Sequence, residues 1–361
     1  MKNLFLLAGL SAILFASCSN DEEPTVKRSD NLTFEFAVVN KAEDGSNLMR
    51  SGLYSSEAKH KVSRVVVYAF KKNGADYLYE KTFDNILWPG EGISSYTYVV
   101  DEADDLSTGD YKLLAVGREA TDSYTLTTLN ATTNFDDFSA SYTLPRANNA
   151  IFAGSATLTV GAAGGGNVSI QMTRQVAGLV GYFSNVPSDI NGETPDILAI
   201  VVTEAENSGF GNTTVNLTTG TGSNPYPSAN TLVVVDLRTQ TTGMDGTVPV
   251  FMGNTVSNVT KLDTTQLNGS YIIPTKSVKM ELVLAKIVGG QLGTPLRSWP
   301  VKMSSNGSTT FDIIANHYYT LGTKNSNTDT DDDTPINLNR NEAIYLTILP
   351  DWTEIHDLVI D

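Results

Sequence analysis

Cys18 is the only cysteine among 361 residues, and its thiol is the strongest nucleophile that the sequence offers. It follows an apolar run over residues 4–16 and the small residues Ala16 and Ser17. An apolar run of this length after a basic N-terminus is typical of a signal peptide and too short for a membrane span. Small residues directly before a cysteine are typical of bacterial lipoproteins, in which the thiol carries a diacylglycerol and the chain is cut before it. We therefore expect a lipid on Cys18 and a signal peptide over residues 1–17.

The residues that follow the cysteine indicate where the protein is displayed. Residues 18–30 form a polar tether, and Asp21, Glu22 and Glu23 make its first part acidic. Such an acidic patch is typical of surface-exported lipoproteins in certain Gram-negative anaerobes. We expect a lipoprotein exposed on the outer membrane and held there by lipid instead of a helix. A secreted protein with a chance cysteine is the alternative.

The other reactive side chains match no catalytic or metal-binding motif. No metal-binding or nucleotide-binding signature surrounds the histidines or the glycine-rich run at residues 161–166. The three histidines are His60, His317 and His356. Asp329, Asp331 and Asp333 alternate like the start of a calcium loop, but the glycine and the distal glutamate of an EF-hand are missing. We expect a solvated loop at residues 325–335, no cofactor and no enzymatic activity.

Composition limits the partners and the stabilising chemistry. The formal net charge is −16, so the surface lacks the basic residues that would displace counterions from a nucleic acid. A lone cysteine that carries lipid leaves no disulfide to stabilise an exported chain, so the core alone must do so. Because of the negative charge, we do not expect a nucleic-acid partner.

Hydrophobic patterning predicts an all-β protein. Short runs rich in β-branched and aromatic residues recur between turn signals such as Asn73-Gly74 and Asn191-Gly192, and helical periodicity is scarce. Several later runs are apolar enough for both faces to be covered. The predicted strands cover residues 32–39, 62–70, 96–100, 111–116, 156–160, 168–172, 179–183, 197–203, 232–237, 248–252, 278–288, 311–314 and 343–349. Many short strands in a turn-rich chain favour β-sandwiches with Greek-key connections.

The length exceeds what one hydrophobic core usually supports, so two domains are expected. A glycine-rich turn at residues 161–166 and one strand precede Thr173, after which a new apolar run begins at Val176. We place an N-terminal β-sandwich domain at residues 31–173 and a C-terminal one at residues 174–361.

The order of these segments resembles the fimbrillins, the subunits of type V pili, including the FimA-like stalk and FimB-like anchor proteins. The segments that carry the resemblance are VSRVVVYAF at 62–70, GDYKLLAVGRE at 109–119, AIFAGSATLTV at 150–160, VSIQMTRQVAGLVGYF at 168–183 with Arg174, and ILPDW at 348–352. The resemblance implies two tandem transthyretin-like sandwiches and a role as a structural subunit in adhesion. It also implies a lipidated precursor at the outer membrane, cleavage by an arginine-specific protease, and assembly by β-strand exchange with other fimbrial subunits.

The implied maturation is placed on particular residues of this chain. Arg50 and Ser51 flank the expected cut, which lies a short distance before the strand at residues 62–70. The strand that would be displaced covers residues 32–39, where Leu32, Phe34 and Phe36 alternate with Thr33, Glu35 and Ala37. The donated strand would be the tail at residues 352–361, anchored by Trp352, Ile355, Leu358 and Ile360, although the tail could instead end the second domain.

Three roles remain open from the sequence. A polymerising subunit is cut at Arg50, whereas an anchor subunit retains its lipid and its first strand, and stays in the membrane. A surface glycan-binding lipoprotein is the rival from another class. It would place tryptophan and tyrosine side chains in one plane on an exposed face, and the tryptophans are Trp88, Trp299 and Trp352. A host receptor or glycan is a further possible partner.

Overall fold

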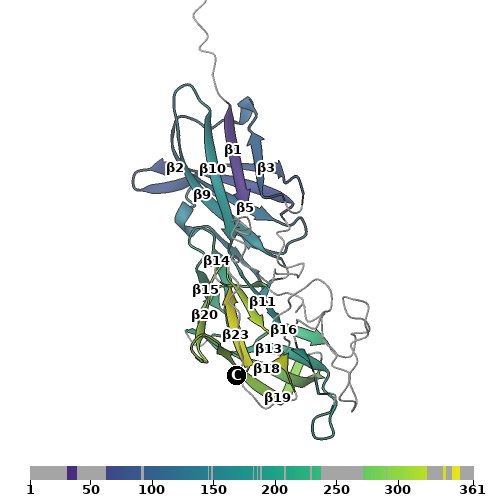
Figure 1. Cartoon of the computed structure of the whole chain (residues 1–361). Coiled ribbons are helices and arrows are strands. Elements are labelled where there is room, and N and C mark those ends of the chain that lie inside the picture. Colours follow the sequence, from purple (N-terminus) through teal and green to yellow (C-terminus); the bar gives the residue numbers. More distant parts are fainter. Residues whose placement is uncertain are drawn as a thin grey trace, which may run out of the picture.

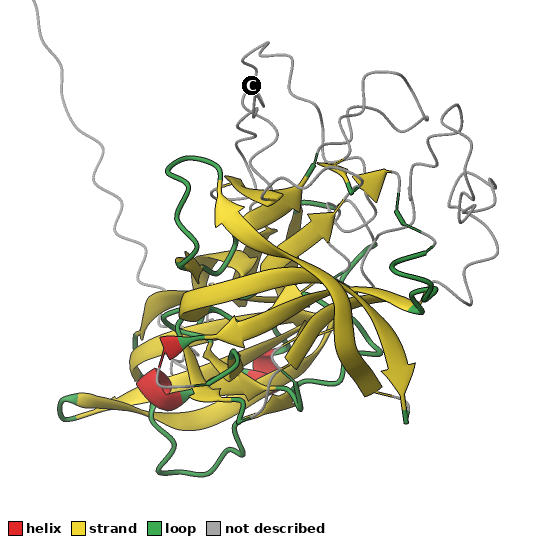
Figure 2. Ribbon diagram, turned by 90° about the horizontal axis from the view of Figure 1, so that it is seen from below, coloured by secondary structure: helices red, strands yellow, loops and turns green. Residues whose placement is uncertain are grey.

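The structure is a computed structural model in which strands dominate (Figure 2). It describes residues 31–38, 62–236, 271–322, 336–338 and 344–349, apart from short gaps at 91–92, 145, 148, 182, 185, 188, 207–208, 228–229 and 290. Short 3-10 helices occur at Glu102–Asp104 and Phe135–Asp137. Within these residues no helix is long and apolar enough to cross a membrane. The all-β prediction is confirmed, and the specific transthyretin-like topology stays a prediction.

Two large sheets lie one above the other along the long axis of the molecule (Figure 1). The first has seven strands, in the order β3 (Asp76–Leu87), β2 (Arg64–Asn73), β5 (Gly109–Arg118), β9 (Ile151–Val160), β10 (Gly166–Arg174), β1 (Leu32–Val38) and β4 (Ser95–Val99). The second has the order β16 (Asn230–Asp236), β13 (Ile197–Glu204), β18 (Thr275–Val288), β19 (Gln291–Met303), β23 (Ile344–Leu349), β21 (Tyr318–Leu321), β11 (Ala177–Gly181), β17 (Tyr271–Ile272) and β8 (Arg146–Ala147), with β20 (Phe311–Ile313) paired to β18.

Two smaller sheets complete the description. A four-stranded sheet has the order β15 (Gly222–Pro225), β14 (Asn212–Asn216), β7 (Ser139–Ser141) and β6 (Thr125–Leu126). A two-stranded sheet joins β12 (Phe183–Ser184) to β22 (Ile336–Asn337).

The seven-stranded sheet folds back on itself between β9 and β10. These strands pair only at Thr173↔Ala153 and Arg174↔Phe152. Beyond that corner, Phe34 on β1 packs edge-on against Phe83 on β3, with ring centroids 5.2 Å apart, so the two arms of the sheet face each other. This arrangement is a β-sandwich with one apolar interior.

Strands β13 and β18 in the second large sheet are buried on both faces. Residues 197–202 of β13 are all buried, as are residues 282–285 of β18. Leu198, Ile200 and Val202 pack into one cluster, whereas Ile197, Ala199 and Val201 pack into another on the opposite face. The prediction of strands covered on both faces is confirmed here, and it explains why these segments lack a polar alternation.

The predicted strands were found, and several polar ones had been missed. The structure places a strand on each predicted range that it describes, while residues 248–252 lie outside the described part. Among the longer strands, the sequence analysis missed β3, β14, β15 and β19, and it started β9 too late; it also missed strands of two or three residues such as β7. These longer missed strands share a partly polar composition, although β3, β15 and β19 each pair with the strand just before them in the sequence.

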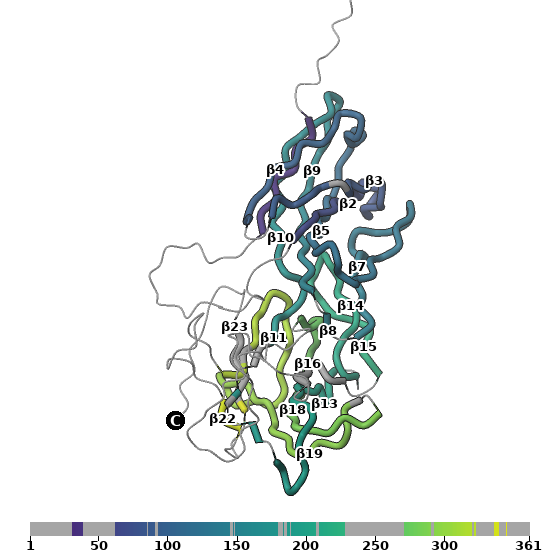
Figure 3. The backbone as a smooth tube through the Cα atoms, turned by 90° about the vertical axis from the view of Figure 1, so that its right-hand side faces the viewer, coloured from purple at the N-terminus to yellow at the C-terminus, as the bar shows by residue number. Residues whose placement is uncertain are grey.

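The two halves of the chain are interlocked at their junction. The β14–β15 hairpin belongs to the second half, yet β14 pairs with β7 of the first half, and β8 of the first half pairs with β17 of the second (Figure 3). The core of the first sandwich also includes residues from the second half besides Val176, which closely follows the boundary. They are Val215, Leu217, Tyr271, Ile273 and Tyr318. The boundary at residues 173 and 174 stays a prediction, since elements on each side of it cross to the other.

Gly154→Ala is expected to destabilise the protein by about 3 kcal/mol or more. A Cβ at this position would lie 1.8 Å from the carbonyl oxygen of Gln171, at the corner where the sheet folds back, and backbone atoms would have to move. Gly161→Ala is the matched control, because nothing lies within 4 Å of its Cβ position. Chemical denaturation of both variants measures the difference, and equal unfolding midpoints would contradict the packing described at the corner.

Alkaline pH is expected to destabilise the fold through buried tyrosines. Burial raises the pKa values of the Tyr124 and Tyr319 hydroxyls above the ordinary 10.0. The Tyr319 hydroxyl donates to the Asp312 carbonyl oxygen at 2.8 Å and accepts from the Ile314 backbone N–H at 2.9 Å. Because the folded-state pKa exceeds the unfolded-state pKa, the stabilisation is complete below about pH 10 and is lost as the pH rises further.

Denaturation from neutral pH to about pH 11 measures this loss. Tyr319→Phe should be less stable than the native protein at neutral pH and should lose less stability on alkalinisation. A native unfolding free energy that stays constant across the alkaline range would contradict the assignment.

Candidate functional site

Strand β1 is a central strand although it comes first in the described chain. It pairs in parallel with β10, from Leu32↔Gly166 to Val38↔Met172, and antiparallel with β4. Two further backbone hydrogen bonds of 2.8 Å extend the β4 side, from the Val100 N–H to the Leu32 carbonyl oxygen and from the Val38 N–H to the Ser94 carbonyl oxygen. Removal of β1 would therefore leave unpaired backbone groups on both neighbours.

The inward side chains of β1 are fully buried. Leu32, Phe34, Phe36 and Val38 are 1%, 0%, 2% and 3% exposed. Burial of four such side chains contributes roughly 1.5–3 kcal/mol each before the entropic cost of ordering the strand. The apolar interior of the first sandwich therefore depends on this strand.

The outward side chains of β1 tolerate polarity. Thr33 and Ala37 are half-buried, and Glu35 is exposed and accepts a hydrogen bond of 3.0 Å from the Asn167 Nδ2. One face of β1 therefore requires apolar side chains and the other accepts polar ones. A shift of the pairing register by one residue would move each set of side chains to the wrong face.

Aromatic rings line the place where β1 lies. Phe34 and Phe36 have ring centroids 5.9 Å apart, and their β4 partners in the register are Tyr98 and Tyr96. Trp88, which is buried, packs edge-on against Tyr96 at 6.0 Å. We name as the β1 site residues 166–172 of β10 and β4 (Ser95–Val99), together with Phe83 and Trp88. Sequence analysis identified Leu32, Phe34 and Phe36 but missed the lining from β3 and β4, for which the alternation of Tyr96 and Tyr98 was the available signal.

Arg174 continues the buried row of β10 beyond the β1 site. Val168, Ile170 and Met172 face the interior, and Arg174 is next in that row, 1% exposed. Its guanidinium carbon lies 4.8 Å from the centroid of the Phe152 ring. Burial lowers the pKa of Arg174 to about 10, because desolvation disfavours its charge. The guanidinium therefore stays charged at neutral pH within the junction.

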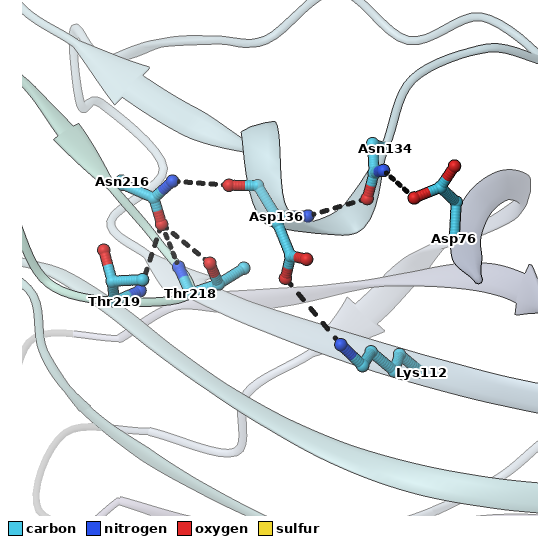
Figure 4. A network of polar contacts seen from close by, with 7 residues as sticks. All are labelled: Asp76, Lys112, Asn134, Asp136, Asn216, Thr218 and Thr219. Carbon is cyan, nitrogen blue, oxygen red and sulfur yellow. Dashed lines mark hydrogen bonds and ion pairs between the residues drawn. The ribbon is translucent and has the colours of Figure 1, made fainter.

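Polar contacts hold the β14–β15 hairpin onto the first half (Figure 4). The Asn216 Nδ2 donates to the Asp136 carbonyl oxygen at 2.7 Å, while the Asn216 Oδ1 accepts from Thr218 and Thr219. The Lys112 ammonium lies 3.7 Å from the Asp136 carboxylate and 4.6 Å from the centroid of the Phe135 ring. The hairpin is thereby tied to the strand layer that carries β5.

The hairpin also contacts the Pro274 carbonyl oxygen elsewhere in the second half. The Asn212 Nδ2 donates to the Pro274 carbonyl oxygen at 2.8 Å. A Cβ on Gly222 would lie 1.7 Å from that same oxygen, so only glycine allows this approach. The hairpin therefore contacts both halves directly.

The described residues before and after the segment that carries Arg50 are Val38 and Val62, and both lie near Met172. Val38 is the register partner of Met172. The Val62 side chain and the Met172 sulfur both lie within 3.5 Å of the Cβ position of Gly117. Val38 and Val62, the described residues on either side of this segment, thus flank the junction end of the β1 site.

Several predicted site residues lie outside the described part of the chain. They are Cys18, Arg50, Ser51, Trp352, Ile355, Leu358 and Ile360. Their roles stay predictions. Residues 329–333 lie outside it as well. In the described ranges, no group of three or more His, Cys, Asp or Glu side chains could hold a metal ion.

The described tryptophans do not form an exposed aromatic platform. Trp88 and Trp299 are 5% and 4% exposed, and Trp352 lies outside the described residues. His317 stacks near Tyr319 with ring centroids 6.4 Å apart, as a half-buried structural contact. Trp88, Trp299 and His317 therefore pack within the fold.

Comparison with known proteins shows what this chain is similar to. A model of the fimbrillin-A-associated anchor proteins Mfa1 and Mfa2 matches residues 47–357. The solved fimbrial anchor protein Mfa2 from Porphyromonas gingivalis is 10% identical, with a TM-score of 0.38 over 81% of this chain and 90% of its own. A fimbrilin, FimA, from Porphyromonas gingivalis W83 is 12% identical, with a TM-score of 0.40 over 89% and 98%. No curated protein matches the chain.

The match of the family model over most of the chain defines the class of protein, a fimbrial structural protein. The chain belongs to the family of fimbrillin-A-associated anchor proteins. The resemblance seen in the sequence is thereby confirmed.

Phe34→Ala is expected to destabilise the protein by about 3–5 kcal/mol, because it removes a fully buried ring and leaves a cavity beside Phe83. Thr33→Ala is the matched control on the outward face and should change stability by less than about 0.5 kcal/mol. Thermal or chemical denaturation compares them. If both variants lose the same small amount, β1 is not a structural part of the first sandwich.

Proposed function

We propose that this chain is a structural subunit of a surface fimbria that serves adhesion, and that β1 is its exchangeable strand. The precursor is attached to the outer membrane through lipid on Cys18. The observation that carries the proposal is the position of β1, a terminal strand that supplies a central, fully buried row to a sandwich otherwise built from residues 62–174.

Cleavage between Arg50 and Ser51 by an arginine-specific protease releases β1 from β2. The cut removes the only covalent link from residues 18–50 to the rest of the mature protein. Noncovalent contacts in the β1 site then hold the strand, and its departure exposes two sheet edges and an apolar row. A strand from a neighbouring subunit restores both, which drives assembly. The predicted tail anchors Trp352, Ile355, Leu358 and Ile360 are this chain's own candidates for donation to a neighbour.

A membrane-retained anchor is the second candidate, and the family model that matches residues 47–357 favours it. In this role the chain retains its lipid and β1, and joins the fimbria through its other parts. The two candidates share location, fold and partners, and they differ in the fate of β1. No described aromatic platform supports the glycan-binding alternative, since Trp88 and Trp299 are buried.

Limited digestion with an arginine-specific protease tests the proposal. The mature chain should be cut once, after Arg50, and should then form ladders with other fimbrial subunits added to it, whereas Arg50→Ala should remain intact and unassembled. Intact mass locates the cut, and the fluorescence of Trp88, which packs against Tyr96 in the β1 site, should change as β1 leaves. Resistance of Arg50, with a lipidated monomer, would support the anchor role instead.

A further inference from the structure

We infer that the β1 site, once vacated, selects a strand from a different protein and rejects the C-terminal tail of a second copy of this chain. This inference rests on the proposed exchange of β1. It follows from two features: every second position of a strand in the site is buried, and each alternating row of residues in the tail includes charged or histidine side chains.

The site requires four apolar side chains at alternating positions. Leu32, Phe34, Phe36 and Val38 fill this row now, and each is at most 3% exposed. Their register partners on β10 include Val168 and Ile170 on the same buried face, and the rings of Phe83, Tyr96 and Tyr98 lie on the other sides.

Charge is accepted only at the intervening positions. Glu35 is exposed and bonds to Asn167, and it lies between the two buried phenylalanines. A carboxylate shifted by one position would lie among the apolar side chains in the row of Phe34 and Phe36. The nearby Lys81 ammonium, 5.3 Å from the centroid of the Phe83 ring, is already paired with Asp104 at 3.0 Å. An unpaired buried charge is far more costly than a buried apolar side chain is favourable.

The tail of this chain cannot present such a row. In residues 350–361 the even positions run Pro350, Trp352, Glu354, His356, Leu358 and Ile360, and the odd positions run Asp351, Thr353, Ile355, Asp357, Val359 and Asp361. Every set of four alternating positions therefore contains at least one carboxylate or His356. The predicted anchors also cannot all lie on one face of an extended strand, because the Ile355 side chain would point away from those of Trp352, Leu358 and Ile360.

Apolar alternation does occur just before the tail, but that segment is already paired. Ile344, Leu346 and Ile348 alternate within β23, which lies between β19 and β21 in the second sheet. Its use would require the second half to lose a central strand of its own. The partner that fits the β1 site is thus another protein chain with an extended segment of alternating apolar and aromatic residues, parallel to β10.

Peptide exchange tests this selection. The protein is the mature chain with a different protease site in place of residues 48–51, so that the test does not depend on cleavage at Arg50. After the cut, it is mixed with labelled peptides covering residues 31–39, residues 351–361, or residues 351–361 with Glu354→Phe and His356→Phe. Size exclusion and intact mass measure peptide that has replaced β1, and Trp88 fluorescence follows the exchange.

The peptide of residues 31–39 should bind, and the native tail peptide should bind on the order of 100-fold more weakly or not at all. The doubly substituted tail peptide, whose row then matches that of β1, should recover most of the affinity. Equal binding of native and substituted tail peptides would overturn the inference and leave strand exchange intact. Failure of every peptide, including that of residues 31–39, would overturn both the exchange and the selection that rests on it.

Discussion

The first sandwich depends on strand β1, which is held in place by side-chain packing and backbone pairing. In the sequence, β1 lies well before the other strands of its sheet. Strand β1 lies between β10 and β4, and its inward row is part of the first core. All other described strands of that sheet come from residues 64–174. The first sandwich is therefore incomplete without β1, and any process that replaces β1 must supply the same backbone pairing and the same apolar row.

The β10 strand connects this site to the junction. Its residues 166–172 pair with β1, and the same inward row then ends in Arg174, buried against Phe152. Beyond the junction, the β14–β15 hairpin contacts β7 on one side and the Pro274 carbonyl on the other. The two halves therefore share a core and a hairpin.

The sequence predicted the parts whose pattern is local. The alternation around Phe34 and Phe36 identified β1 and its buried face, and the continuous apolar run at residues 197–203 identified a strand covered on both sides. These predictions succeeded because a period of two residues follows directly from strand geometry. The all-β class followed from the same patterns and from the turn residues between them.

The parts that could not be predicted depend on distant contacts. Strand β3 is half-exposed and partly polar, so nothing local shows that Phe83 meets Phe34 across the core. The β14 segment, NTTVN, becomes a strand by pairing with β7, more than 70 residues earlier in the sequence. The lining of the β1 site and the interlocked junction required the fold itself.

Hydrogen exchange of the mature protein before and after cleavage between β1 and β2 tests the central claim most directly. The account predicts that amides of β4 and of residues 166–172 in β10 lose protection once β1 departs, while those of β13 and β18 in the second sheet remain protected. Unchanged protection along β4 and β10 after physical removal of β1 would contradict it, because the first sandwich would then be complete without that strand.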